Sequence, residues 1–165
     1  MVLSILNLVG LSAQGLFIGG NVVVSSVTIP SISEGYIAPE TKAKIFLSLY
    51  DRASKIMIAA SSISFLAFGS QAFKGGLKET LTSSYFATAA LSIAPIPLTL
   101  FFIFPVIDKI HAFVQPESAG KVAVNEDIDN LISTWNKLSI VRASVFSLGL
   151  VNIVWHFLGS NIKWT

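Results

Sequence analysis

The side chains of this sequence that could do acid–base or electrostatic chemistry gather in three short stretches. They are Tyr50 and Asp51, then Asp108 and His111, and finally Trp135, Asn136, Ser139 and Arg142. Residues three apart share a helix face, so the carboxylate of Asp108 could orient the imidazole of His111 as a general base. Arg142 stands close to a long apolar stretch, where an ionisable side chain is a candidate functional group. The same arginine could instead pair with Asp51 or Asp108, or reach lipid headgroups, and both interpretations stay open.

A second polar pattern runs along the first 33 residues. Asn7, Gln14, Asn21 and Thr28 recur every seven residues and therefore fall on one face of a helix. Polar groups that face lipid are costly, so we expect this stripe to face other helices, with Gly15-x-x-x-Gly19 giving close backbone approach nearby. The stripe would then either hold helices together or place Gln14 and Asn21 in a substrate pocket.

Several kinds of site have no support in the sequence. The chain has no cysteine and two histidines, which excludes disulfides, thiolate ligands and sites that need three histidines. It contains no P-loop, no GxGxxG after a strand, no HExxH and no GxSxG, the motifs of nucleotide, dinucleotide and common hydrolase chemistry. A net charge of +2 without a basic run gives no reason to expect a nucleic-acid partner.

The elements that must position these groups are membrane-spanning helices. Hydrophobic residues make up 53% of the chain and charged residues 12%, whereas about a quarter of the residues of a soluble domain are charged. A helix of about 20 apolar residues crosses a bilayer, and the sequence has four stretches without charge, at 1–33, 56–73, 80–107 and 143–162. We therefore predict an all-α integral membrane four-helix bundle, one domain over residues 1–165, with helices at about 3–29, 49–73, 83–107 and 134–158.

The longest connection between these helices is residues 112–133, which could fold back over the mouth of the bundle. Its acidic run from Asn125 to Asn130 is typical of a helix start, because acidic and capping side chains suit the first turn. The end of the bundle that carries this loop also carries the chemical side chains and most of the Lys and Arg residues. The excess of Lys and Arg predicts that this face is cytoplasmic.

Three blocks of the sequence resemble the anthrone-oxygenase-like family of small four-helix membrane proteins. The first span contains Gly15-Leu16-Phe17-Ile18-Gly19 and ends at Ile29-Pro30, and the third contains Pro95-Ile96-Pro97-Leu98-Thr99 followed by Phe104-Pro105. The fourth contains the pattern Trp135-x-x-Leu138-x-x-x-Arg142. The chain departs from the family pattern at Asp108, where relatives commonly carry Asn in this region, and at Ser139, where they often carry Asn or His.

The resemblance implies a four-helix membrane enzyme of aromatic polyketide biosynthesis, located in the endoplasmic reticulum of a fungus. Such an enzyme would convert an anthrone to an anthraquinone with O2 as co-substrate and without an organic cofactor. His111 or Asp108 would be the base, and Arg142 and Asn136 would stabilise the oxyanion. Trp135 and Tyr50 would be aromatic walls, and the remaining substrate-binding candidates are Asp51, Ser139, Asn21 and Gln14.

Other functions fit the same sequence. A second candidate is an oxygen-independent isomerase or cyclase that acts on a polyketide or terpenoid, which the residues at 108 and 139 favour. A third is a non-catalytic accessory or transport protein, in which the polar residues serve packing and assembly. We predict no metal site, although Asp108, His111, Asp127 and Asp129 would offer ligands if the long loop folded back, and a haem stays open too. The expected partners are a lipophilic small molecule and membrane lipids, and a homo-oligomer is compatible with the sequence.

Overall fold

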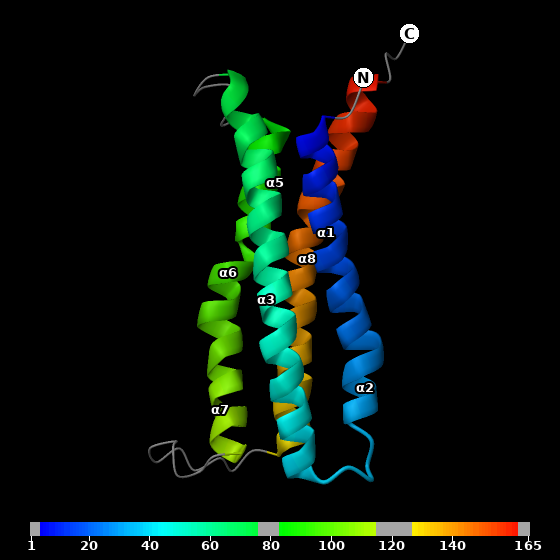
Figure 1. The fold of residues 1–165 in the computed structure, drawn as a ribbon, viewed down its shortest axis with the longest axis vertical. Coiled ribbons are helices and arrows are strands. Elements are labelled where there is room, and N and C mark those ends of the chain that lie inside the picture. Colours follow the sequence, from blue (N-terminus) through cyan, green and yellow to red (C-terminus); the bar gives the residue numbers. More distant parts are fainter. Residues whose placement is uncertain (1–3, 76–82, 115–126, 162–165) are drawn as a thin grey trace.

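The computed structural model describes residues 4–75, 83–114 and 127–161, and within them the chain forms a bundle of long helices without strands (Figure 1). Four continuous helical segments are long and apolar enough to cross a membrane: Ile5–Ile32, Pro39–Ala72, Ser84–Val114 and Ile128–Gly159. The start of α1 and the end of α8 lie at the same end of the bundle (Figure 1). The all-α membrane-bundle fold predicted from the charge-free stretches is confirmed.

The first and third spans are built from several pieces. The first consists of α1 (Ile5–Val23), a π-helical turn at Val24–Thr28 and α2 (Ile29–Ile32). The third consists of α5 (Ser84–Ile93), α6 (Pro95–Leu98), a π-helical turn at Thr99–Ile103 and α7 (Phe104–Val114). The second and fourth spans are regular helices of 34 residues each, α3 (Pro39–Ala72) and α8 (Ile128–Asn161), and a short 3-10 turn at Phe73–Gly75 follows α3.

Both π-helical turns end two residues before a proline, Pro30 in the first span and Pro105 in the third. A proline has no N–H to donate, and its ring clashes with the carbonyl four residues earlier. In each span the N–H just before the proline, on Ile29 or Phe104, donates to the carbonyl five residues back. The wider turn accommodates the proline without breaking the span, and such π-bulges often occur at functional sites.

The second and fourth spans extend beyond the residues predicted for them. α3 begins ten residues before Leu49, and α8 begins six residues before Thr134. At 1.5 Å per residue each helix is about 51 Å long, well over the roughly 30 Å of hydrocarbon in a bilayer. The extra turns carry charged residues, which the charge-free stretches could not include. Asp127 stands just before α8, in keeping with a helix start there, whereas Asn125, Glu126 and most of the loop at 112–133 lie outside the described residues.

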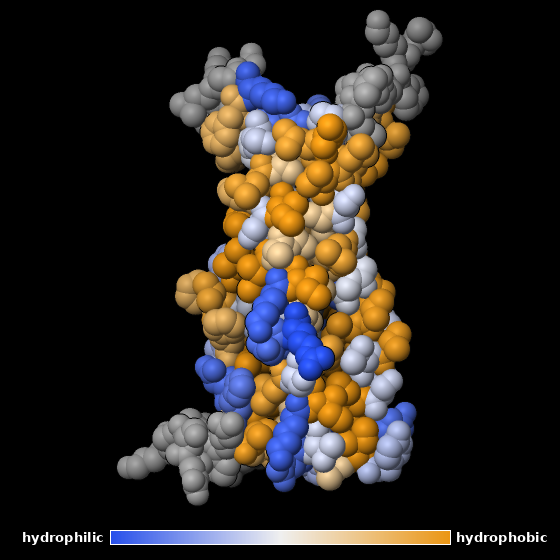
Figure 2. All heavy atoms as spheres, in the orientation of Figure 1, coloured by the Kyte–Doolittle hydropathy of each residue, from blue (hydrophilic) through white to orange (hydrophobic). Residues whose placement is uncertain are grey.

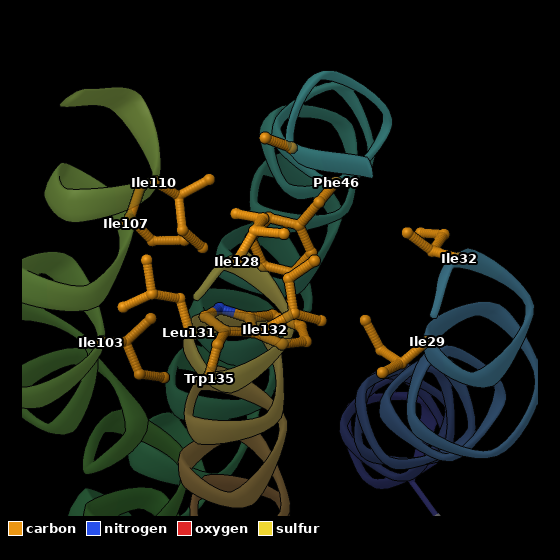
Figure 3. Packing of buried hydrophobic residues seen from close by; sticks show 11 residues of the cluster. Ile29, Ile32, Phe46, Ile103, Ile107, Ile110, Ile128, Leu131, Ile132 and Trp135 are labelled. Carbon is orange, nitrogen blue, oxygen red and sulfur yellow. The ribbon is translucent and has the colours of Figure 1, made fainter. Parts of the chain in front are cut away.

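The interior of the bundle contains three clusters of buried apolar side chains. The largest lies at the end of the bundle where α8 begins and draws on all four spans (Figure 3). The second contains Phe17 stacked on Phe146, with ring centroids 4.0 Å apart, together with Met57 and Ala60. The third surrounds Phe68 near the other end. Large apolar side chains also cover most of the visible outer surface, as expected for helices that face lipid (Figure 2).

The close contact between α1 and α3 uses different glycines from those predicted. Gly15 and Gly19 are exposed, and a Cβ atom at either position would meet nothing within 4 Å. A Cβ on Gly10 would lie 2.7 Å from the ring of Phe68, and one on Gly20 would clash with the methyl group of Met57. The prediction that Gly15 and Gly19 allow close approach within the bundle is therefore wrong, because their faces of α1 point outward.

A partly buried ion pair joins α3 to α8 at the end of the bundle where α8 begins. The ammonium of Lys42 lies 2.8 Å from the carboxylate of Asp129 and also donates to the carbonyl of Ser33 at 3.4 Å. The Lys42 side chain is 5% exposed and that of Asp129 is 44% exposed. Removing one member of a buried pair leaves the other charge without compensation, which is costly.

We expect Asp129→Asn to destabilise the protein by about 1 to 3 kcal/mol, less than for a fully buried pair because Asp129 is partly exposed. The measurement is the melting temperature of the purified protein in detergent. Glu40→Gln is the matched control, since it breaks the exposed pair of Glu40 and Lys44, and it should leave the melting temperature unchanged. Equal effects of the two substitutions would contradict a special role for the buried pair.

Candidate functional site

Arg142 lies in the interior of the bundle, 7% exposed. It follows the first residue of α8 by 14 positions, which is about 21 Å of helix. One terminal nitrogen of its guanidinium donates to Asn21 Oδ1 and to Ser139 Oγ, both at 3.1 Å, and the other donates to Thr99 Oγ1 at 3.3 Å. The first, third and fourth spans therefore meet at this side chain.

The three partners of Arg142 are themselves held in one orientation. The amide nitrogen of Asn21 donates to the carbonyl of Phe17 at 2.8 Å, which turns its oxygen toward Arg142. The Ser139 hydroxyl donates to Asn21 Oδ1 at 2.9 Å and accepts a hydrogen bond from the guanidinium. Thr99 donates to the carbonyl of Pro95 at 2.7 Å, so it also meets Arg142 as an acceptor. Each partner is oriented by a hydrogen bond to another group, so its oxygen is directed at Arg142 as an acceptor. The guanidinium is therefore held in one position.

The positive charge of Arg142 is not neutralised by any carboxylate of the residues that the structure describes. Its hydrogen-bond partners are neutral, and its Nε–H is buried without a partner. The face of the Phe17 ring, 5.8 Å from the guanidinium carbon, gives a cation–π contact. Since a guanidinium carries five N–H donors, this one keeps capacity for an anionic or strongly accepting ligand. Of the two interpretations of Arg142, pairing with Asp51 or Asp108 is wrong, because neither lies within salt-bridge distance.

Arg142 borders an apolar cavity of about 190 Å³. Its walls come from α1, α3, α8 and the proline-containing part of the third span. The lining residues are Phe17, Tyr50, Ser54, Met57, Ile58, Ser61, Pro95, Ile96, Thr99, Leu100, Phe104 and Arg142. Of these, Tyr50 and Arg142 are titratable, and the others are apolar or carry a hydroxyl. A mainly apolar cavity with a few convergent polar groups is the usual form of a small-molecule site.

A second cavity of about 20 Å³ adjoins the first and shares Tyr50, Ser54, Met57 and Arg142 with it. Asn21 and Trp135 complete its polar and aromatic lining. The rings of Tyr50 and Trp135 meet edge to face with centroids 6.2 Å apart, and Trp135 also meets the edge of Phe46 at 5.0 Å. This second cavity is about large enough for one water-sized molecule.

The structure brings five of the sequence-predicted site residues together. Arg142, Ser139 and Asn21 form the hydrogen-bonded group, and Tyr50 and Trp135 stand beside it as the predicted aromatic walls. Residues from positions 21, 50 and 142 thus form one site.

The other predicted residues lie outside this group. Asp108 and His111 are exposed on α7, and Asp51 is exposed on α3, where it pairs with Lys55 at 3.0 Å. Asn136 is half-buried, one residue beyond Trp135, and its side-chain oxygen is buried without a partner. None of these four is among the described residues that line the two cavities.

The polar stripe of the first span serves two purposes. Asn21 reaches Arg142, whereas Gln14 donates to Ser92 at 3.4 Å in a separate buried layer. In that layer Ser64 also bonds Ser92 Oγ at 2.8 Å, and Ser61 donates to the carbonyl of Ser92. Asn7 bonds Gln71 and Tyr85 near the other end. The stripe is therefore mainly a set of contacts between helices, and one member belongs to the site.

Thr99 and Phe17 are site residues that the sequence did not single out. Their signals were present but indirect. Thr99 follows Pro95 by four residues, the spacing at which a threonine hydroxyl reaches the backbone carbonyl of the preceding turn. Phe17 stands four residues before Asn21, one turn along the polar stripe. Neither spacing shows that the side chain faces the arginine of another span.

The described residues hold no group of three or more His, Asp or Glu side chains that could bind a metal ion. Of the four residues considered for such a site, Asp129 is occupied by Lys42, and Asp127 accepts a bond from the backbone N–H of Asp129 at 3.4 Å. Asp108 and His111 are exposed on α7.

A family model described as anthrone oxygenase matches residues 46–151. The matched region is about two thirds of the chain and contains Tyr50, Thr99, Trp135, Ser139 and Arg142. No curated protein and no solved structure matches the chain.

We expect Asn21→Leu to destabilise the protein by about 2 kcal/mol or more, because it removes the buried acceptor of the Ser139 hydroxyl and of one N–H of Arg142. The free energy of unfolding can be followed by tryptophan fluorescence in detergent. Ser26→Ala, an exposed position of the same span, is the control and should change it little. An Asn21→Leu protein as stable as the parent would show that this acceptor does not hold Arg142.

Proposed function

The chain belongs to the anthrone oxygenase family, and from this membership we propose that it is a membrane-embedded tailoring enzyme of aromatic polyketide biosynthesis that oxidises an anthrone with O2. The observation that carries the proposal is Arg142, a buried cation with an unused N–H at the edge of an apolar cavity. A planar aromatic molecule with one oxygen that becomes negative during the reaction matches both parts of this site. The apolar walls would hold the rings, and the guanidinium would stabilise the charge.

The reaction needs one proton transfer and one oxidation. Loss of a proton from the activated ring CH2 gives a delocalised anion whose charge rests largely on the ring oxygen. This anion passes one electron to O2, and the resulting radical and superoxide combine to a peroxide anion. The peroxide takes back the proton, and the hydroperoxide loses water to leave a carbonyl. Overall, CH2 and O2 become C=O and H2O. Arg142 lowers the barrier by stabilising the anion, and the apolar cavity excludes bulk water from the reactive intermediates.

Tyr50 is the best-placed group for the proton transfer. It lines both cavities and is the titratable lining residue besides Arg142. As a tyrosinate it would take the proton from the ring CH2, and the exposed side chains of Asp108 and, one turn further along α7, His111 would carry the proton between the site and water. In this proposal Asp108 and His111 belong to the proton path and do not touch the substrate. Asn136 does not touch the substrate either and supports the helix beside Trp135.

We also propose the co-substrate, the cofactor requirement and the membrane location of the enzyme. O2 is the co-substrate and no organic cofactor takes part. The protein resides in the endoplasmic reticulum membrane of a fungus, with the end that carries Lys42 and Asp129 toward the cytoplasm. The co-substrate, the absence of a cofactor and the organelle are what the family resemblance implies, and the orientation follows from the distribution of Lys and Arg along the chain.

The direct test is oxygen uptake with product analysis, using the purified protein in nanodiscs and emodin anthrone as substrate. We expect uptake above the spontaneous rate and formation of the anthraquinone. Arg142→Gln should lower kcat/KM by about 10² to 10³, the usual cost of losing an oxyanion-stabilising donor. Arg52→Gln, which removes an exposed arginine from α3, is the matched control and should retain full activity.

A folded protein without uptake above the spontaneous rate would overturn the oxygenase proposal. Hydrogen–deuterium exchange at the ring CH2 then identifies the runner-up, an oxygen-independent isomerase or cyclase, because the same arginine and tyrosine could catalyse enolisation without O2. Absence of both activities would favour a non-catalytic membrane role.

Tyr50→Phe should lower kcat by about 10² while leaving the KM for the anthrone nearly unchanged, because it removes the hydroxyl but keeps the aromatic wall. The solvent deuterium isotope effect on kcat reports the proton transfer and should change in this variant. Tyr36→Phe alters an exposed tyrosine between the first two spans and serves as the control. Unchanged kcat in Tyr50→Phe would assign the proton transfer to another group.

A further inference from the structure

The end of the bundle where α8 begins is closed by apolar side chains. Eleven buried residues from all four spans form this plug (Figure 3). They include Phe46, Ile132 and Trp135, and none of the eleven is more than 5% exposed. Arg142 and the cavity lie beyond the plug, two turns further along α8 than Trp135. A ligand that came along the bundle axis from this face would have to displace the plug.

The bundle is also packed on the other side of the cavity. The stacked rings of Phe17 and Phe146 lie there with Met57 and Ala60. Beyond them, Gln14, Ser64 and Ser92 are buried and bonded to one another. The route along the axis from the opposite face is therefore filled as well.

The side of the cavity between α3 and the third span is open. Three of its lining residues are also exposed on the outer surface of the bundle: Ile58 at 52%, Leu100 at 50% and Phe104 at 43%. They come from α3, the π-helical turn at Thr99–Ile103 and α7. An apolar rim that faces outward from a transmembrane bundle meets lipid rather than water.

The charges on α3 indicate the depth of this opening in the bilayer. Asp51 and Lys55 form an exposed ion pair, with side chains 67% and 73% exposed, and Lys55 stands less than one turn before Ile58. Exposed charges are costly in hydrocarbon and belong at the headgroup region. No charged residue follows Lys55 in α3, and from Lys55 to the end of α3 at Ala72 the helix rises about 26 Å, close to the thickness of the hydrocarbon. This register places the opening just inside the hydrocarbon, below the headgroups.

We propose that the cavity at Arg142 is entered sideways from the bilayer, through a portal formed by Ile58, Leu100 and Phe104. The substrate class is then a membrane-dissolved, planar aromatic molecule with an acidic or acceptor oxygen and no large polar substituent. A molecule lying flat just below the headgroups would pass its rings through the portal and bring its oxygen to the guanidinium. The identity of the aromatic rests on the proposed function, whereas the portal rests on the structure of the cavity.

A second apolar groove provides an internal control for this proposal. It has a volume of about 160 Å³ and is lined by Leu98, Phe102, Ile103, Leu138 and Val141. It lies between the third span and α8, and Arg142 is not among its lining residues. Val141, 54% exposed, can be enlarged without affecting the opening at Leu100.

Because the chain has no cysteine, a single engineered cysteine reports access to the cavity without interference. Ser61→Cys places a thiol at a lining position that is 1% exposed. In liposomes, we expect neutral, lipid-soluble methyl methanethiosulfonate to modify this thiol, and we expect the charged trimethylammonium-ethyl reagent not to do so from either aqueous side. Adding Leu100→Trp should slow the neutral reagent by about tenfold or more, whereas Val141→Trp should leave its rate nearly unchanged.

Every outcome of this experiment bears on the portal. Modification by the charged reagent at a comparable rate would overturn the proposal in favour of an aqueous route. No reaction with the neutral reagent, or no effect of Leu100→Trp, would overturn it too. The measurement needs no substrate, so its result is separate from that of oxygen uptake: access through the portal without anthrone oxidation would overturn the proposed function and leave the portal standing.

Discussion

A buried guanidinium without a carboxylate is costly to hold inside a membrane protein, and the middle of this bundle is arranged to hold one. Arg142 can stay charged there because neutral oxygens from two other spans and from its own helix accept hydrogen bonds from its guanidinium. The face of the Phe17 ring adds a cation–π contact. These contacts leave Nε–H unused, so the desolvation cost is only partly offset. A ligand with a negative or strongly accepting oxygen would complete the offset. The same incomplete pairing would make the proposed site selective for a ligand with such an oxygen.

The prolines of the first and third spans are what make this arrangement of acceptors possible. Pro30 and Pro105 each lie just beyond a π-helical turn, and both wide turns occur near the level of the arginine. In the third span the turn begins at Thr99, whose hydroxyl is bound to the carbonyl of Pro95 and so faces Arg142 as an acceptor. In the first span Asn21 stands one turn before the wide turn. A regular helix would continue the backbone ladder through these positions and would give the side chains a different rotation.

The distribution of apolar packing explains how such a polar site can face lipid. The largest apolar cluster closes the end of the bundle where the loops and charged residues lie, and the Phe17–Phe146 pair packs the other side of the cavity. What is left is a lateral opening beside the third span, where a π-helical turn widens the helix and exposed apolar side chains form the rim. The proposed chemistry benefits from this design. An anthrone is poorly soluble in water and its anion reacts readily, so delivery from the bilayer into a cavity closed to both aqueous faces would limit side reactions.

Composition and the spacing of charges determined the fold class of this protein, because the cost of placing charges in hydrocarbon leaves charge-free stretches of the length of a membrane span. The seven-residue polar stripe also predicted that Asn21 faces other helices, and the family resemblance singled out Trp135 and Arg142 as candidate site residues; all three are buried. The sequence did not determine which polar residues meet. Asp108 and His111 share a face and looked like a base, yet that face of α7 is exposed, and Thr99 was overlooked although it binds the arginine. Periodicity fixes which residues share a face of one helix, whereas the rotation and depth of each helix against its neighbours depend on packing among residues far apart in the chain. Only the tertiary structure decides the rotation and depth of each helix. These in turn decide the closed end, the lateral opening and the group of residues around Arg142.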